Sequence, residues 1–352
     1  MKPRRGRRLV LRIILTIAAV ALVLQLAPLG DIARQLAGAQ WPWVIAALLL
    51  QVLLRLVTAA RMQLLAHFQQ LRIGFWIMLK IVLATAFYGL FLPGGIAGGA
   101  VTFVKYRQFG ASGAAALTNL FVNKAVAALT IGLLICTAWL IDLLPASDGN
   151  LTLPRLALIA LALLVLLLLP SLLRLTVSAF GLAPRLQRRF ASSKGRVVQA
   201  ILAALSQLQL VRNLGWWQIF SLILAGCTAH LIAVAGMFCF GLALELTPAF
   251  STVTWIFGVV FLLAMLPISF ANFGVREASM ILLLAPYGVG AAEATAWSIL
   301  MYTGPLAAAL AGAVVEAALH RSRDDRHECN VAIREQTVAD PVTGATRKQL
   351  RQ

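Results

Sequence analysis

Charged side chains inside long apolar segments are the residues of this sequence best suited to bind a ligand. Lys124 lies well inside one apolar segment, and Arg276 and Glu277 directly follow a break in another. An ionisable group held in apolar surroundings costs free energy and usually marks function. We expect Lys124 and Arg276 to bind an anion. Glu277 either orients Arg276 or forms a purely structural pair with it, and the sequence leaves both interpretations open.

Two glycine-containing turns add backbone donors to these cations. The first turn ends in Gly98 and Gly99 and precedes Lys105, and the second holds Asn272 and Gly274. Free N–H groups at the start of a helix, together with the positive end of its dipole, bind anions. With Lys105, Lys124 and Arg276 nearby, this pattern predicts a phosphate-headed substrate. The predicted substrate-binding residues are Arg276, Glu277, Lys124, Lys105, Gly98, Gly99, Gly274 and Asn272.

Other ionisable residues carry a weaker signal. His230, near the middle of an apolar segment, is either a hydrogen-bonded core histidine or a proton carrier. Arg55, Lys80 and Glu316 lie near the ends of their segments, where we expect them to reach the membrane surface. The sequence has no nucleophile–base set, metal-ligand spacing or phosphate-binding Walker loop. We therefore expect no enzyme activity, no catalytic residues, no metal and no cofactor.

The composition requires a membrane around these residues. The chain is 61% apolar and 12% charged, whereas a soluble domain is about 25% charged. Its net charge is +18, and the bases crowd into the ends and loops, above all the N-terminus and the acid-free stretch between residues 174 and 215. Basic loops are typical of the cytoplasmic side of membrane proteins, so we expect no nucleic-acid partner.

The segmentation predicts an all-α integral membrane protein. Apolar segments of spanning length, about 20 residues, number about six. They cover residues 9–27, 41–60, 112–141, 153–173, 216–242 and 290–319. Two more segments, 75–110 and 251–288, are interrupted by Pro93 and Pro267 with nearby glycines. Because proline and clustered glycines stop helices, we expect two broken or re-entrant helical hairpins.

Loop charges set the expected orientation. If both broken segments return to the side they entered from, the base-rich loops all face the cytoplasm. Both termini are then cytoplasmic, and the two hairpins enter from opposite sides as an inverted repeat, which is typical of transporters. We expect residues 1–319 to form the transmembrane domain and residues 320–352 a disordered cytoplasmic tail.

Two stretches carry a family resemblance. Leu92–Val101 and the element Gly274-Val275-Arg276-Glu277 after Leu266-Pro267 resemble the lysylphosphatidylglycerol synthase transmembrane region, a flippase-like family of prokaryotic membrane proteins. The resemblance covers residues 9 to about 320 and implies movement of lipids or lipid-linked intermediates between leaflets. The chain departs from the family pattern at Gly99 and Asn123, where family members often carry an acid.

The sequence thus predicts a flippase-like transporter. It would move an anionic lipid or a polyprenyl-phosphate-linked intermediate across the bacterial inner membrane. One alternative is a proton-coupled transporter of a small soluble anion, using His230 or Glu277. Another is a scaffold without transport activity for an envelope glycosyltransferase, which would then be a protein partner.

Overall fold

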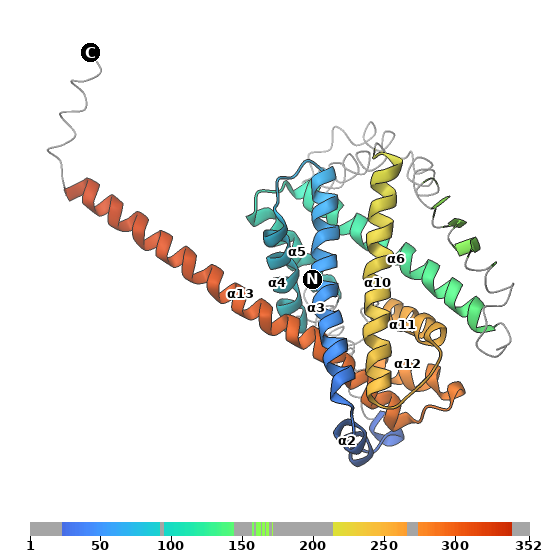
Figure 1. The fold of residues 1–352 in the computed structure, drawn as a ribbon. Coiled ribbons are helices and arrows are strands. Elements are labelled where there is room, and N and C mark those ends of the chain that lie inside the picture. Colours follow the sequence, from blue (N-terminus) through green and yellow to red (C-terminus); the bar gives the residue numbers. More distant parts are fainter. Residues whose placement is uncertain are drawn as a thin grey trace, which may run out of the picture.

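The computed structural model describes residues 23–91, 95–143, 214–265 and 274–339, with scattered helical positions between 157 and 171. Within these ranges the regular structure consists of helices only. Their order is shown in Figure 1 and begins with the short helix α2 (Leu29–Ala37). The expectation of an all-α membrane protein is confirmed for this part of the chain.

Four described helices are long and apolar enough to cross a membrane. They are α3 (Trp41–Phe68), α6 (Gly113–Leu143), α10 (Trp216–Ala243) and the first part of α13 (Ala291–Ala339). They correspond to four of the predicted spans. The other two, 9–27 and 153–173, fall largely outside the described residues.

Each predicted hairpin contains two shorter helices. The first consists of α4 (Phe75–Phe91) and α5 (Gly95–Gln108), and the second of α11 (Phe250–Met265) and α12 (Val275–Leu284). At 1.5 Å per residue the longest of them is roughly 26 Å, which is less than the hydrocarbon thickness of about 30 Å. Pro93 and Pro267, the predicted break points, lie outside the described residues.

The helices of each pair also pack against each other. In the first pair the hydroxyl oxygens of Thr85 in α4 and Thr102 in α5 are 2.9 Å apart. Beyond α12, a short 3-10 helix, η1 (Ala285–Tyr287), leads toward α13.

Helices α3 and α10 lie side by side and run in opposite directions (Figure 1). The amide of Gln40, just before α3, donates to the carbonyl of Ala243 at the end of α10, with an N–O distance of 2.8 Å. The exposed indoles of Trp41 and Trp217 therefore lie at opposite ends of this pair. Indoles prefer the membrane–water interface, so the two ends define the two membrane surfaces.

Helix α13 contacts α2, α3, α4, α10 and α12, and its C-terminal part projects away from the bundle (Figure 1). Its closest approach is at Gly312, where an added Cβ would lie 2.2 Å from the carbonyl oxygen of Leu83 in α4. The helix continues past residue 319 to Ala339, where the sequence predicted a disordered tail. Residues 320–339 contain neither proline nor glycine, so nothing in this stretch stops the helix.

Candidate functional site

A cavity of about 490 Å³ lies among α3, α6, α10, α11, α12 and α13. One part of its described lining is cationic and consists of Arg55, Arg61, Lys124 and Arg276. Most of the remaining lining is apolar and comes from α10, α11 and α13. No acidic residue is among the described residues that line the cavity. A space with several cations and no acid favours an anionic guest.

Helix α3 contributes a polar stripe to this cavity. Gln51, Arg55, Thr58 and Arg61 all line it and are spaced three or four residues apart. Residues at this spacing share one face of a helix. The predicted span 41–60 places Arg55 near the membrane surface and Arg61 in the loop beyond the span, but α3 continues to Phe68 and both residues line the cavity. The spacing of four polar residues in an apolar helix is the signal that would have identified them.

The depth of the site follows from the same helix. Arg55 lies roughly 21 Å along α3 from Trp41, at 1.5 Å per residue. Arg61 lies roughly 30 Å from the same tryptophan, and His230 roughly 21 Å from Trp216 on the antiparallel α10. Because the indoles mark the two membrane surfaces, Arg55 and His230 lie near the middle of the membrane, and the cavity extends from there toward the C-terminal end of α3 at Arg61.

Arg55 and Arg61 lack protein partners at one nitrogen each. The Nε atoms of both are buried and have no hydrogen-bond partner in the described part of the chain. The described ion pairs, which involve Arg34, Lys105 and Arg276, include neither of them. A buried donor without an acceptor is costly. Arg55 and Arg61 therefore bring positive charge to the cavity lining that no described acidic residue balances.

Lys124 of α6 and His230 of α10 both line the cavity. Lys124 on α6 lines the cavity and interacts electrostatically with Arg61. The ring of His230 on α10 lies edge-on to Phe261, with centroids 5.2 Å apart. Its Nε2 is 3.1 Å from the carbonyl oxygen of Ala127, which can only accept, so Nε2 is the donor. This is the arrangement of a hydrogen-bonded core histidine, and the proton-carrier role stays a prediction.

Arg276, at the start of α12, is held in place by α13. Its Nε donates to Ser298 Oγ at 3.0 Å, and its Nη2 donates to the Ser298 carbonyl at 2.6 Å. The guanidinium also lies over the Tyr302 ring, 3.3 Å from the centroid. None of these contacts uses Nη1. A guanidinium fixed by its Nε and Nη2 atoms while its residue lines the cavity is well suited to present its charge to a ligand.

Glu277 holds this arrangement together. It is 6% exposed and accepts hydrogen bonds from Gly274 N at 2.7 Å and from Ser298 Oγ at 3.0 Å. Its Oε1 is 3.7 Å from Arg276 Nη2. Sequence reasoning expected the Gly274 N–H to bind phosphate, but Glu277 occupies it in the structure. Gly274 itself has a φ of 83°, a backbone conformation that favours glycine. Asn272, the other residue predicted in this turn, lies outside the described residues.

The predicted residues of the first hairpin are placed elsewhere. Lys105 is buried and forms an ion pair with Glu316 of α13, to which Tyr88 Oη also donates at 3.3 Å. Gly98 packs on Thr85 of α4, and an added Cβ on Gly99 would meet nothing within 4 Å. None of these residues is among the described lining of the cavity. Glu316, expected at the membrane surface, is instead buried as the partner of Lys105.

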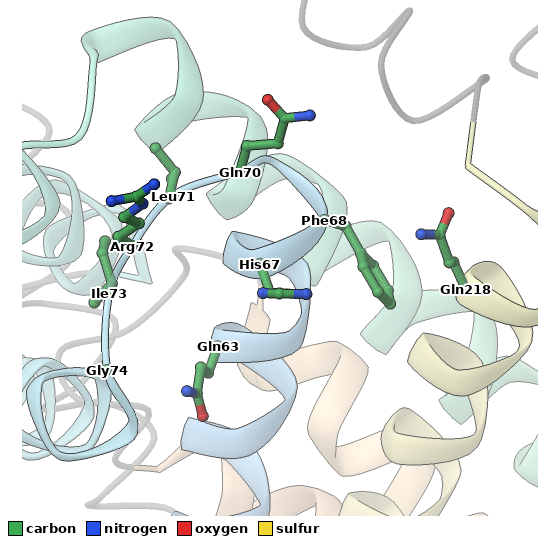
Figure 2. Close-up of a pocket in the computed structure, with 9 residues that line it drawn as sticks. All are labelled: Gln63, His67, Phe68, Gln70, Leu71, Arg72, Ile73, Gly74 and Gln218. Carbon is green, nitrogen blue, oxygen red and sulfur yellow. The ribbon is translucent and has the colours of Figure 1, made fainter.

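A second pocket, of about 620 Å³, lies at the end of α3 (Figure 2). Its lining comes from α3, the turn that follows and the start of α10, and includes Gln63, His67, Arg72 and Gln218. Figure 2 shows these mostly polar side chains around the turn. Arg72 is the only Lys or Arg in the described lining, so the mid-membrane cavity is the stronger candidate for an anion.

The comparisons with known proteins agree with this fold. The model of the family described as the lysylphosphatidylglycerol synthase TM region matches residues 9–309. The matched range includes the cationic residues of the cavity and both pairs of short helices. No curated protein gives a significant match to the chain. Because the family model covers most of its length, this multi-pass membrane protein belongs to the lysylphosphatidylglycerol synthase TM region family.

Proposed function

We propose that this protein moves an anionic lipid, such as a phospholipid or a polyprenyl-phosphate-linked intermediate, between the leaflets of the bacterial inner membrane. The observation that carries the proposal is the mid-membrane cavity lined by Arg55, Arg61, Lys124 and Arg276 with no acid in its described lining. Cations at this depth are costly unless a ligand or a water-filled space compensates them. An anionic headgroup crossing the membrane supplies that compensation.

Each cation has a distinct role in this proposal. Arg55 and Arg61 provide two guanidinium groups on α3, and Lys124 provides an ammonium group on α6. Arg276 is a fixed charge that α13 positions through Ser298. The apolar side chains of the lining, such as Met237 and Phe261, accommodate the beginning of the acyl or prenyl chain.

The second hairpin is the element that gates this site. Phe257, Phe261 and Ala264 of α11 and Arg276 of α12 all line the cavity, so a movement of this pair opens or closes it. The first hairpin contributes no described lining residue. The first hairpin contacts the site indirectly, through α13. Glu316 of α13 forms an ion pair with Lys105 of the first hairpin, and Met301 of the same helix lines the cavity.

A translocation assay tests this function. Purified protein is reconstituted into vesicles with phosphatidic acid or phosphatidylglycerol labelled on the acyl chain, and a membrane-impermeant quencher reports the outer leaflet. We expect faster exchange of both anionic lipids than of labelled phosphatidylcholine. Arg61→Gln should remove most of the increase in the exchange rate of the anionic lipids, whereas Lys80→Gln should keep that increase. Lys80 is the matched control because it is an exposed cation outside the described lining.

The outcome separates transport from the scaffold role. Exchange at the same rate with and without protein, or exchange unaffected by Arg61→Gln, would remove the cavity from any transport mechanism.

The proposal also includes an orientation. The loop charges favour both termini in the cytoplasm, and the base-rich residues 174–215 would face the same side.

A further inference from the structure

The number of uncompensated charges in the cavity carries an inference about the headgroup, which rests on the proposed function. Of the four lining cations, Arg276 has an acidic neighbour, since Glu277 Oε1 is 3.7 Å from its Nη2. Arg55, Arg61 and Lys124 have no acidic partner within ion-pair distance in the described part of the chain. Three positive charges therefore remain to be balanced by a ligand.

Two of these charges, on Arg61 and Lys124, also repel each other. Arg61 interacts electrostatically with Lys124 across the cavity, and Arg55 lies on the same face of α3. In surroundings of low dielectric constant such repulsion is much stronger than in water. A ligand with one negative charge would leave a net positive charge in the middle of the membrane. A ligand with two or more negative charges would balance the site far better.

Lipid headgroups differ in this respect. A phosphodiester such as phosphatidylglycerol carries a single negative charge. A terminal phosphate carries about −1.5 to −2 near neutral pH and offers three acceptor oxygens, and a diphosphate carries more. Arg55, Arg61 and Arg276 each bring a guanidinium with several N–H donors to the cavity lining, and Arg276 Nη1 is not used by the contacts that fix Arg276. Donors on α3 and α12 are best met by a headgroup with several oxygens.

We propose that the cavity selects a lipid whose headgroup ends in a phosphate or diphosphate, which can carry two or more negative charges, over lipids with a phosphodiester. An aminoacylated phosphodiester is selected against most strongly, because its ammonium group adds to the positive charge already present. The shared chemistry is a terminal phosphate on an apolar chain, and the source is either a glycerolipid or a prenyl lipid.

Binding of matched short-chain lipids tests this selection. The purified full chain is titrated calorimetrically with dioctanoyl phosphatidic acid, dioctanoylglycerol diphosphate and dioctanoyl phosphatidylglycerol, which share one tail. We expect the first two to bind at least about tenfold more tightly, since each added charge-assisted hydrogen bond has roughly that effect. Competition between undecaprenyl phosphate and phosphatidic acid shows whether a prenyl lipid binds the same site. A titration with inorganic diphosphate shows whether a soluble anion binds without a lipid tail.

Variants connect the selection to the counted charges. Arg61→Gln and Lys124→Gln should each bring the affinity ratio between phosphatidic acid and phosphatidylglycerol toward one, and Lys80→Gln should leave it unchanged. Equal affinity of the three lipids in the unaltered protein would overturn the selection while leaving anionic lipid transport intact. Absence of binding by all of them would overturn both. Inorganic diphosphate binding as tightly as the lipids would keep the charge rule but replace the lipid by a soluble substrate.

Discussion

Lys105 of α5 and Glu316 of α13 form a buried ion pair that joins the first hairpin to the long C-terminal helix. Tyr88 of α4 donates to the same carboxylate, so both helices of the hairpin are attached to one residue of α13. The same helix fixes Arg276 of the second hairpin through Ser298. Helix α13 is therefore the common support of both hairpins.

Neutralising Glu316 should destabilise the protein more than neutralising both partners. Glu316→Gln leaves Lys105 as an unpaired buried charge, a change that costs about 3–5 kcal/mol in buried pairs. The double variant Lys105→Met with Glu316→Gln removes that charge and should recover much of the loss. Thermal unfolding of the detergent-solubilised variants measures both. Equal stability of the single variant and the unaltered protein would mean that the pair is solvated in the membrane.

Removing a cavity cation should have the opposite effect on stability. Arg55→Gln or Arg61→Gln takes away a buried, unpaired charge, so we expect the ligand-free protein to be more stable by about 1 kcal/mol or more. Transport should fall at the same time, because the charge serves the ligand rather than the fold. The unfolding temperature and the rate of lipid transport in vesicles, measured on the same preparation, test whether stability rises while transport falls. A loss of both would indicate that these arginines support the fold.

Arg276→Lys should impair transport although it retains the positive charge. A lysine cannot donate to both Ser298 Oγ and the Ser298 carbonyl while stacking on Tyr302 as the planar guanidinium does. We expect a decrease of about tenfold or more, corresponding to the loss of at least one charge-assisted hydrogen bond. Ser298→Ala, which removes one of these contacts, should give an intermediate rate. Full transport by Arg276→Lys would show that charge alone suffices at this position.

Gly274→Ala should destabilise the start of α12. Its φ of 83° is unfavourable for a residue with a side chain, and such a conformation costs about 1–3 kcal/mol. The amide would also be displaced from Glu277, which accepts its hydrogen bond. The change in unfolding temperature measures the cost, and Gly99→Ala is the control because its surroundings are open. Equal effects of the two changes would contradict a special role for the Gly274 conformation.

The orientation can be tested at the two ends of α3. Thr247 lies beyond the end of α10, beside the start of α3, and Gly74 lies beyond the end of α3. Both positions are exposed, so each can be replaced by a single cysteine, Thr247→Cys or Gly74→Cys, in a cysteine-free background. With cytoplasmic termini, an impermeant thiol reagent added to intact cells should label position 247 and not position 74. The reverse pattern would invert the topology derived from the loop charges.

The long helices and the short helices that flank the predicted breaks were predictable because apolar length and proline–glycine clusters act locally. The spans at α3, α6, α10 and α13 and the short helices on either side of both breaks follow from these signals. The end of α3 was less predictable: Arg61 was assigned to a loop because its charge interrupts the apolar segment, whereas the helix continues since a cavity accommodates that charge.

The partners of the charged residues were not predictable, because they depend on contacts between distant segments. Lys105 and Glu316 are separated by 211 positions, and neither residue's neighbours reveal the other. Lys124, His230 and Arg276 were correctly expected in apolar surroundings, and the structure places all three around one cavity. Glu277 follows Arg276 in sequence, so its role in holding that arginine was foreseeable, although its bond to Gly274 was not.

The mid-membrane position of the cavity has a consequence for the direction of movement. The four cations belong to the helices, so in the proposed transport any net charge carried across the membrane would belong to the lipid. An electrical potential that is negative inside the cell favours outward transfer of an anionic headgroup by about 2.3 kcal/mol per charge for every 100 mV. A doubly charged headgroup would gain twice as much. Imposing a potassium diffusion potential on reconstituted vesicles should therefore accelerate transfer toward the positive side, with a steeper voltage dependence for terminal phosphates than for phosphodiesters.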